Sequence, residues 1–387
     1  MNQRLQQVST FHVVEMLERA QRLEADGRDV IHLEVGEPDF PTPPLIVEAG
    51  VRALNDGVTR YTAALGTDLL RARIAADYAQ RLGVQVEPER IAVTSGASGA
   101  LLLALAAVCD VGDEVLLPDP GYPCNETFAL GVGARPVALP TAVTNAWQPC
   151  AAEVEAAWGA RTRALLVASP SNPAGAVLSR SQLTELIQVV RARDGWLLLD
   201  EIYQGLMLEP AEFSSGLDLD PGLISINSFS KFFGMTGWRL GWLVAPAPLI
   251  PAIERLAQNL FISPSAPAQA AALAAFEPDT LALCEQRRVS LIERQRCLGS
   301  GLAQLGFGLP VAPRGAFYTV ADIEPLGLAM DAMTFCKQLL DRAGVALAPG
   351  LDFGSNGTDT LVRFAATVPR ERLDEACVRI ARFLEDA

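Results

Sequence analysis

The chain has 387 residues, a length that suggests about two or three domains and excludes a single small binding module. Its 31 Lys and Arg residues face 45 Asp and Glu residues, so the net charge is −14 and the pI is about 4.7. This balance argues against nucleic-acid or anionic-membrane partners. Histidine and lysine occur only twice each, which argues against a Ser-His-Asp hydrolase and against a metal centre built from several histidines.

The cysteines and the N-terminus indicate a cytoplasmic protein. Seven cysteines are scattered without a C-x-x-C pair, and the first residues lack the apolar segment of a secretory signal. The longest apolar run, residues 100–109, is much shorter than the about 20 residues that span a bilayer. We therefore expect a reducing compartment and no membrane segment.

In chain order, residues 11–25 have the 3.6-residue apolar period of an amphipathic helix that ends at Gly27, and a strand is predicted at 30–35. Between about residue 45 and residue 244, short apolar runs alternate with helical patterns. The runs are 91–95, 114–119, 164–169, 196–201, 223–227 and 239–244. This alternation predicts an α/β fold with a mostly parallel sheet.

Two further patterns complete the predicted organisation. Ser179 and Gln182 have capping-box spacing ahead of a helix that connects two of the strands. After about residue 285, longer polar helices and short strands predict a smaller α+β domain. We expect residues 1–44 to pack with that small domain (286–387), and residues 45–285 to form the large domain.

The two lysines differ in their surroundings. Lys337 lies four residues from Asp341 on a predicted amphipathic helix, as an ordinary solvated lysine would. Lys231 follows the run 223–227 among three phenylalanines, with Arg239 eight positions on. An amine in apolar surroundings loses its proton more readily and becomes a usable nucleophile. The alternative is a loop lysine whose stem passes along aromatic rings.

Two other segments supply polar groups at strand ends. Asp200 lies at the end of the run 196–201 and Tyr203 follows it, at a place where carboxylates face the ligand crevice of α/β proteins; a helix-capping aspartate is the alternative. Gly96, Ala97 and Ser98 lie between a strand and a helix, so their N–H groups suit a phosphate. This turn departs from the dinucleotide and P-loop patterns, and backbone geometry alone can require Gly and Ser there.

A lysine, a strand-end carboxylate and a phosphate-binding turn together match the needs of pyridoxal 5'-phosphate. In this combination the sequence resembles the class I and II aminotransferases of pyridoxal-phosphate fold type I, over nearly its whole length. The matching motifs are VGEPDFPTP (35–43), RYTAALGTDLLR (60–71), SGASGAL (95–101), DPGYP (119–123), SPSNPAG (169–175), DEIY (200–203), SFSKFFGMTGWRLGW (228–242) and LVRFA (361–365). The resemblance implies a large cofactor-binding domain with a sheet of the seven-stranded type.

The resemblance also implies roles for residues around the cofactor ring. Lys231 would bond to the cofactor and later move the proton on the substrate carbon, and Asp200 would keep the ring nitrogen protonated. Tyr203 and Asn172 would bind the phenolic oxygen of the ring, and Tyr122 would stack on its face. Read without the resemblance, Asn172 could be only a turn residue and Tyr122 only a core aromatic.

The remaining implied contacts concern the phosphate and the substrate. Ser228, Arg239 and the turn at 96–98 would hold the phosphate, and Tyr61 would reach the phosphate of the neighbouring subunit in a homodimer. Arg363 would bind the substrate α-carboxylate beside the backbone of Gly36. The alternative for both arginines is an ion pair with a surface acid, although Arg363 lies in an apolar run where a buried guanidinium needs an anion.

The expected function is transfer of an amino group from an L-amino acid to a 2-oxo acid by a ping-pong mechanism, with no metal. A β-eliminating carbon–sulfur lyase on the same scaffold is one alternative, since it would use the same lysine and arginines. A cofactor-binding transcription regulator is another alternative. It would need a DNA-binding segment ahead of this domain, but the matching motifs begin as early as Val35, and the net charge of −14 opposes binding to DNA phosphates. No motif fixes the substrate side chain, and Arg60, Arg255 and Arg314 remain available for an acidic one.

Overall fold

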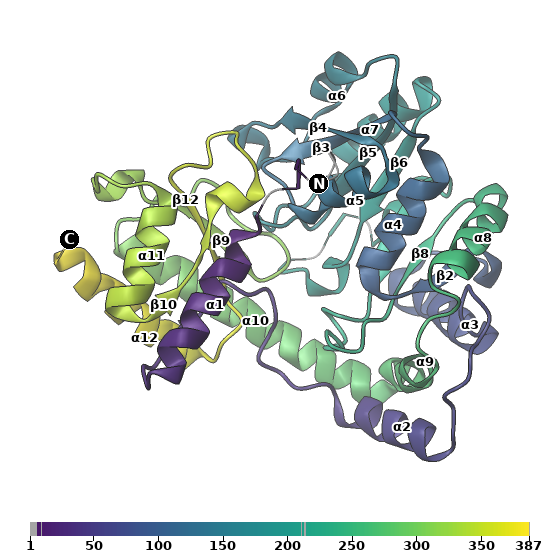
Figure 1. Cartoon of the computed structure of the whole chain (residues 1–387), viewed down its shortest axis with the longest axis horizontal. Coiled ribbons are helices and arrows are strands. Elements are labelled where there is room, and N and C mark those ends of the chain that lie inside the picture. Colours follow the sequence, from purple (N-terminus) through teal and green to yellow (C-terminus); the bar gives the residue numbers. More distant parts are fainter. Residues whose placement is uncertain (1–5, 9, 210, 213, 387) are drawn as a thin grey trace.

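Figure 1 shows the protein as a computed structural model, which describes residues 6–8, 10–209, 211–212 and 214–386. Residues 1–5 and 9 of the predicted N-terminal segment lie outside this part of the chain. A central sheet with helices on both faces occupies one side of the molecule, and helix α1 (His12–Ala25) lies with the C-terminal helices α11 (Ala332–Ala343) and α12 (Arg370–Glu385) on the other side. The predicted α/β fold class is confirmed.

The central sheet has seven strands in the order β2-β8-β7-β6-β5-β3-β4. These strands are β2 Ile91–Thr94, β3 Glu114–Asp119, β4 Arg135–Pro140, β5 Thr162–Ala168, β6 Trp196–Asp200, β7 Ile224–Ser228 and β8 Gly241–Val244. Only β8 runs antiparallel to its neighbours, β2 and β7. The other neighbouring pairs are parallel, as the alternation of strands and helices predicts.

Twelve α-helices are assigned in the described part of the chain. They are α1 His12–Ala25, α2 Pro44–Asn55, α3 Asp68–Asp77, α4 Gly96–Val108, α5 Cys124–Val132, α6 Ala151–Ala157, α7 Arg180–Ala192, α8 Ile250–Leu260, α9 Ala266–Ala272, α10 Pro278–Gln304, α11 Ala332–Ala343 and α12 Arg370–Glu385. Helix α7 begins at the predicted capping box, in which Ser179 Oγ accepts from the Gln182 N–H and Gln182 Oε1 accepts from the Ser179 N–H. None of the described helices is long and apolar enough to cross a membrane.

All strands of the sheet except the edge strand β4 are buried on both faces, which explains their continuous apolar runs. No continuous apolar run predicted β4, whose residues are mostly exposed or half-buried. In β6, Leu198 packs into a cluster shared with α4, α5 and α8, whereas Leu197 and Leu199 pack into a cluster shared with α3, α7 and α9 on the opposite face. The same alternation holds along β5, so two helical layers cover the sheet (Figure 1).

Both ends of the chain build the second group of elements. Strand β1 (Ile31–His32) pairs in parallel with β10 (Val345–Ala346), so the predicted strand at 30–35 is shorter than expected. Strands β11 (Ala348–Pro349), β12 (Leu361–Ala365) and β9 (Tyr318–Asp322) form an antiparallel sheet. Side chains of α1, α10, α11 and α12 share one apolar core around these strands. The predicted boundary at residue 286 falls inside α10, and the division into domains stays a prediction.

Candidate active site

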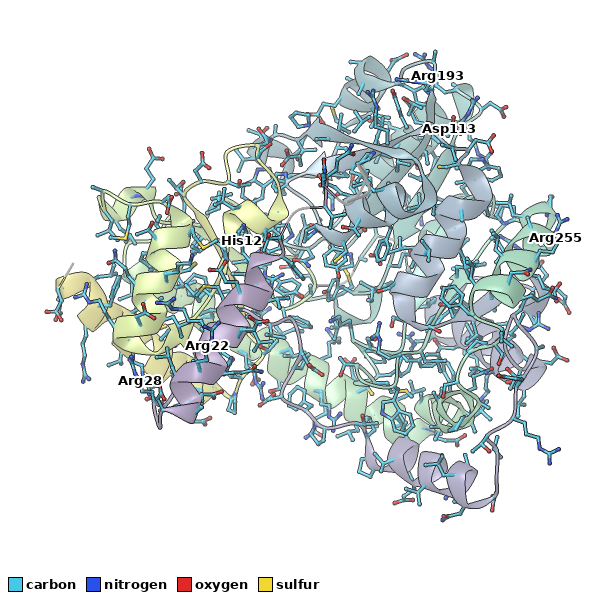
Figure 2. All side chains as sticks on the ribbon, in the orientation of Figure 1. His12, Arg22, Arg28, Asp113, Arg193 and Arg255 are labelled. Atoms are coloured by element: carbon cyan, nitrogen blue, oxygen red, sulfur yellow. The ribbon has the colours of Figure 1, made fainter. Side chains whose placement is uncertain are left out.

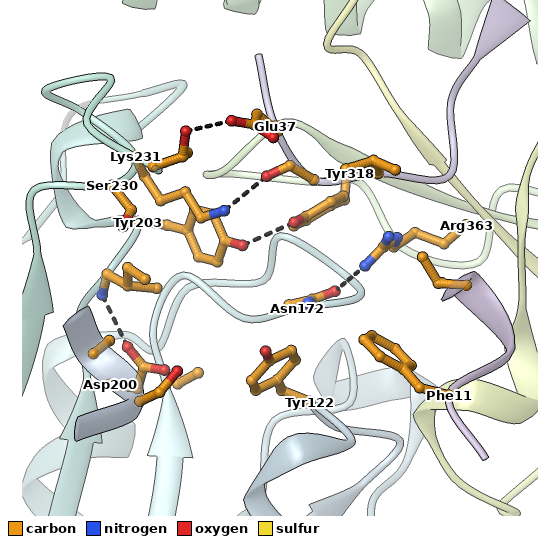
Figure 3. A pocket seen from close by; sticks show the side chains of 18 of the residues that line it. Phe11, Glu37, Tyr122, Asn172, Asp200, Tyr203, Ser230, Lys231, Tyr318 and Arg363 are labelled. Carbon is orange, nitrogen blue, oxygen red and sulfur yellow. Dashed lines mark hydrogen bonds between the residues drawn. The ribbon is translucent and has the colours of Figure 1, made fainter. Parts of the chain in front are cut away.

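A cavity of about 370 Å³ opens where the central sheet meets the second group of elements. Its floor comes from the carboxyl ends of β5 and β6 and from the first turn of α4, the position at which parallel sheets of α/β proteins bind ligands. Residues of β9, β12 and α1 close the other side. Figure 3 shows its polar side chains converging from these elements.

Lys231 lines this cavity three residues after the end of β7. Its Nζ donates a hydrogen bond to the Gly36 carbonyl oxygen at 2.7 Å and lies 5.8 Å from the centre of the Tyr203 ring. A Cβ atom at position 36 would lie 2.0 Å from Tyr318 Oη, so only glycine lets this segment come so close. Among the described residues, no carboxylate lies within ion-pair distance of this amine.

Asp200 ends β6 and is only 6% exposed. Its Oδ1 accepts a hydrogen bond from the Ile202 N–H at 3.0 Å. Burial raises the pKa of Asp200 to about 6, although that hydrogen bond and the charge of Lys231 oppose the shift. A cationic N–H group that enters the cavity would stabilise the ionised form of this buried carboxylate.

Two tyrosines meet on the other side of Lys231. Tyr203 Oη and Tyr318 Oη lie 2.8 Å apart, and the two rings contact each other edge to face (Figure 3). Burial raises the pKa of Tyr203 well above its ordinary value, with the Tyr318 hydroxyl adding to the effect. The Tyr203 phenol therefore stays protonated and can serve as a hydrogen-bond donor.

Arg363 of β12 is a buried cation with no carboxylate partner among the described residues. Its Nη1 donates to Asn172 Oδ1 at 2.8 Å and its Nη2 donates to a backbone carbonyl, while its Nε has no partner in the structure. The Tyr318 and Phe353 rings contact the guanidinium, with their centres 4.3 and 4.8 Å away. A buried guanidinium in this state suits an external carboxylate.

The turn before α4 forms an anion cradle. Ala97 and Ser98 line the cavity at the N-terminus of this 13-residue helix, and no side chain caps it. Arg239 lines the same corner, and within the described part of the chain its guanidinium donates only to the Thr236 carbonyl oxygen. Gly96 has a φ of +72°, and a Cβ atom there would lie 2.6 Å from Arg239 Nη2. Free N–H groups and a guanidinium so close together fit a phosphate dianion.

Most of the predicted site residues line this one cavity. Those that do are Gly36, Ala97, Ser98, Tyr122, Asn172, Asp200, Tyr203, Lys231, Arg239 and Arg363. Tyr61 lies elsewhere and is 81% exposed. Gly96 lies behind the cavity wall, as does Ser228, whose Oγ accepts from the Ser230 N–H at 3.0 Å. Neither His12 nor His32 lines the cavity.

The structure adds site residues that were not predicted, although one of them, Ser230, lies within the motif 228–242. Ser230 and Tyr318 line the cavity, as do apolar residues of α1 and the residue before it. The structure also corrects the surroundings of Lys337, whose Nζ pairs with Glu15 of α1 at 2.8 Å rather than with Asp341. Asp341 instead accepts two hydrogen bonds from Arg19, because α1 packs against α11 and presents both partners.

Comparison with known proteins agrees with this geometry. The family model for class I and II aminotransferases matches residues 28–380. A valine–pyruvate aminotransferase of Mycobacterium tuberculosis is 36% identical over 379 residues, 97% of each chain, and a (5-formylfuran-3-yl)methyl phosphate transaminase of Methanocaldococcus jannaschii is 36% identical over 387 residues, 99% of each. The Thermus thermophilus aspartate aminotransferase solved with maleate superposes with a TM-score of 0.92 at 34% identity, covering 99% of both chains.

The fold and the matched family define a pyridoxal-phosphate-dependent enzyme. The chain belongs to the class I and II aminotransferase family. It transfers amino groups between amino acids and 2-oxo acids.

Proposed function

We propose that Lys231 is the catalytic lysine of this aminotransferase and that Asp200, Tyr203 and Arg363 act with it. One observation carries the proposal: the Lys231 amine shares a cavity with a buried carboxylate and a buried guanidinium, yet pairs with no carboxylate of the described chain. When bound, pyridoxal phosphate supplies an aldehyde that reacts with amines and a cationic ring that withdraws electrons.

The residues around Asp200 fit the ring of that cofactor. Asp200 would accept a hydrogen bond from the ring N–H and keep the ring cationic, which would give this desolvated carboxylate a partner. Tyr203 and the Asn172 amide would donate to the phenolic oxygen, and Tyr122 would pack against the ring.

The turn before α4 fits the phosphate. The N–H groups of Ala97 and Ser98 and the guanidinium of Arg239 bind the dianion. Ser230, the residue before Lys231, also lines the cavity and would add its hydroxyl to the phosphate contacts. Ser228 supports it from behind by accepting the Ser230 N–H.

Arg363 and Lys231 handle the substrate. Arg363 binds the α-carboxylate through its fork of N–H groups, including the Nε that lacks a partner. Lys231 would take the proton from the substrate α-carbon and hold it on its amine until the transfer is completed. The Gly36 carbonyl oxygen holds the lysine amine on this side of the cavity.

Chemical trapping tests the lysine assignment. Borohydride reduction of the holoenzyme should attach the cofactor to the peptide that contains Lys231, and mass spectrometry identifies that peptide. Lys231→Ala should lower kcat by at least about 10³-fold, whereas the matched control Lys337→Ala should retain wild-type turnover because that side chain pairs with Glu15 at the surface. Full turnover by Lys231→Ala would refute the assignment.

A β-substituted amino acid separates transamination from β-elimination. With β-chloroalanine and an added 2-oxo acid, we expect the acceptor to be aminated. Release of ammonia and pyruvate without amination of the acceptor would contradict the proposed use of these residues.

We also propose a homodimer in which Tyr61 completes the neighbouring site. Val47, Val51 and Leu54 of α2 form an exposed apolar stripe continued by Val58, close in sequence to the 81% exposed Tyr61. Apolar stripes of this kind mark protein interfaces. Light scattering should give the mass of two chains, and Val51→Asp should lower it to one.

Mixing two inactive variants tests the shared site. Tyr61→Phe and Lys231→Ala should each be impaired alone. If each site combines Lys231 of one subunit with Tyr61 of the other, each hybrid dimer has one intact site of two. Because about half of the dimers in an equimolar refolded mixture are hybrids, the mixture should regain about a quarter of the wild-type activity. No restoration would count against Tyr61 acting across the interface.

We propose that the enzyme is cytoplasmic. All seven cysteines are free thiols, as expected in a reducing compartment. Cell fractionation with activity measurements checks this proposal.

A further inference from the structure

Helix α1 places an apolar wall against the cavity. Val13 and Leu17 line it together with Phe11, the residue that precedes the helix, and Val14. Met16 and Ala20 of the same helix are fully buried in the core below, so the helix presents one apolar face to the protein and a second one to the cavity. Val14 remains 44% exposed, so its side chain is accessible to a molecule in the cavity.

The wall lies next to the proposed substrate carboxylate site. Phe11 and Tyr122 lie on the same side of the cavity, below the hydrogen bond between Asn172 and Arg363 (Figure 3). A substrate held by Arg363 therefore extends its side chain toward this wall or toward the Lys231 side.

Two adjacent residues, Asp352 and Phe353, hold helix α1 and the Arg363 guanidinium in fixed positions relative to each other. Helix α1 has no side-chain cap of its own; instead both carboxylate oxygens of Asp352 accept hydrogen bonds from the His12 and Val13 N–H groups, each at 2.7 Å. The adjacent Phe353 packs on the Arg363 guanidinium and shares an apolar cluster with Val13. The apolar wall is thus held at a set position relative to the carboxylate site.

No spare cation faces this wall. Of the described residues that line the cavity, Lys231, Arg239 and Arg363 are the basic ones, and each has a role above. Arg60, Arg255 and Arg314 do not line it; Arg255, in the middle of α8, is exposed at the edge of the molecule (Figure 2), and Arg314 pairs with Glu209. The remaining acid, Glu37, lies on the Lys231 side, where it accepts from the Thr236 hydroxyl (Figure 3).

We infer that the preferred substrate of this site is an amino acid with an uncharged, apolar side chain, which packs against Phe11, Val13, Val14 and Leu17. The inference rests on the proposed function, since it uses Arg363 as the α-carboxylate site. An aspartate or glutamate side chain would place an unpaired carboxylate against the apolar wall. A longer aliphatic side chain gains apolar contact with the wall instead.

A donor panel with the holoenzyme tests this specificity. With one acceptor held constant, kcat/KM for leucine should exceed that for alanine by roughly tenfold or more and should exceed those for aspartate, glutamate and arginine. Unreactive analogues give a second readout: 4-methylpentanoate should inhibit at a lower concentration than succinate. If an acidic or basic donor is preferred, including through a cation of a partner subunit, the inference is wrong.

Variants of the wall locate the specificity. Val14→Arg should lower the ratio of kcat/KM for leucine to that for aspartate by roughly tenfold or more, and Val14→Ala should lower the leucine-to-alanine ratio. Val378→Arg is the matched control, because this valine of α12 is 50% exposed and does not line the cavity; its ratios should equal those of wild type. Unchanged ratios in folded, cofactor-bound Val14 variants overturn the inference.

The outcomes separate this inference from the proposed function. If no donor is transaminated, or if Lys231→Ala turns over fully, the proposed function fails. If amino groups are transferred through Lys231 with an acidic donor preferred, only the substrate inference fails.

Discussion

Replacing Asp200 with Asn should change how the stability of the cofactor-free protein depends on pH. The ordinary pKa of this carboxyl is 3.8, and burial raises it to about 6 in the folded protein. Between these values the folded protein binds more protons than the unfolded chain, so the free energy of unfolding falls as the pH rises. At about 1.4 kcal/mol for each pH unit, the wild type loses about 3 kcal/mol across that interval.

Urea unfolding at a series of pH values measures this loss. The difference in unfolding free energy between Asp200→Asn and wild type should grow by about 2 kcal/mol from about pH 4 to about pH 7, most of the total of about 3 kcal/mol, because the amide does not ionise. Because both proteins share all the other carboxylates, the pH-dependent contributions of those groups to the unfolding free energy cancel in the difference. Asp56→Asn, at an exposed position after α2, controls for the loss of a negative charge. A difference that stays constant over this range would show that the folded protein does not hold Asp200 in its protonated form.

Three further variants probe the site. Arg363→Lys should lower kcat/KM roughly 100-fold for every amino donor alike, because an ammonium cannot replace the fork of N–H groups, and steady-state kinetics with several donors measures this; a loss confined to one donor would contradict a role at the α-carboxylate. Tyr318→Phe removes the 2.8 Å bond to Tyr203, so the pH midpoint of the visible cofactor spectrum should shift by about one pH unit, whereas an unshifted spectrum would mean that Tyr318 does not influence the ring contacts. Asp352→Asn weakens two charged hydrogen bonds to α1, which should cost about 1–3 kcal/mol and speed amide exchange in that helix; unchanged exchange would exclude Asp352 as its cap.

Local patterns predicted every strand of the central sheet except the edge strand β4, because the predicted strands are buried on both faces whereas β4 is largely exposed and has no continuous apolar run. The apolar run of β6 and the Gly-containing turn before α4 each depend on residues within one short segment. The capping box of α7 is equally local, with Ser179 and Gln182 three residues apart. For such features the sequence contains the whole physical cause.

The rest of the cavity depends on contacts between distant segments. His12 and Asp352 are 340 residues apart, and no periodicity in the sequence indicates that this carboxylate caps α1 and so sets its apolar face against the cavity. Tyr318 reaches Tyr203 only because β9 joins the sheet that carries Arg363. The amphipathic pattern predicted helix α1, but it could not show that the helix has a second apolar face toward a ligand.

Lys337, which pairs with Glu15 outside the cavity, provides an internal standard for chemical labelling of the lysine amines. The chain has two lysines, one in the cavity and one at the surface between α1 and α11, where its side chain is 37% exposed. An acylating reagent applied in a cell extract modifies Lys337 whether or not the cavity is filled. The yield at Lys231 divided by that at Lys337 then falls as more cavities hold a ligand. The ratio therefore measures occupancy without purification or an activity assay.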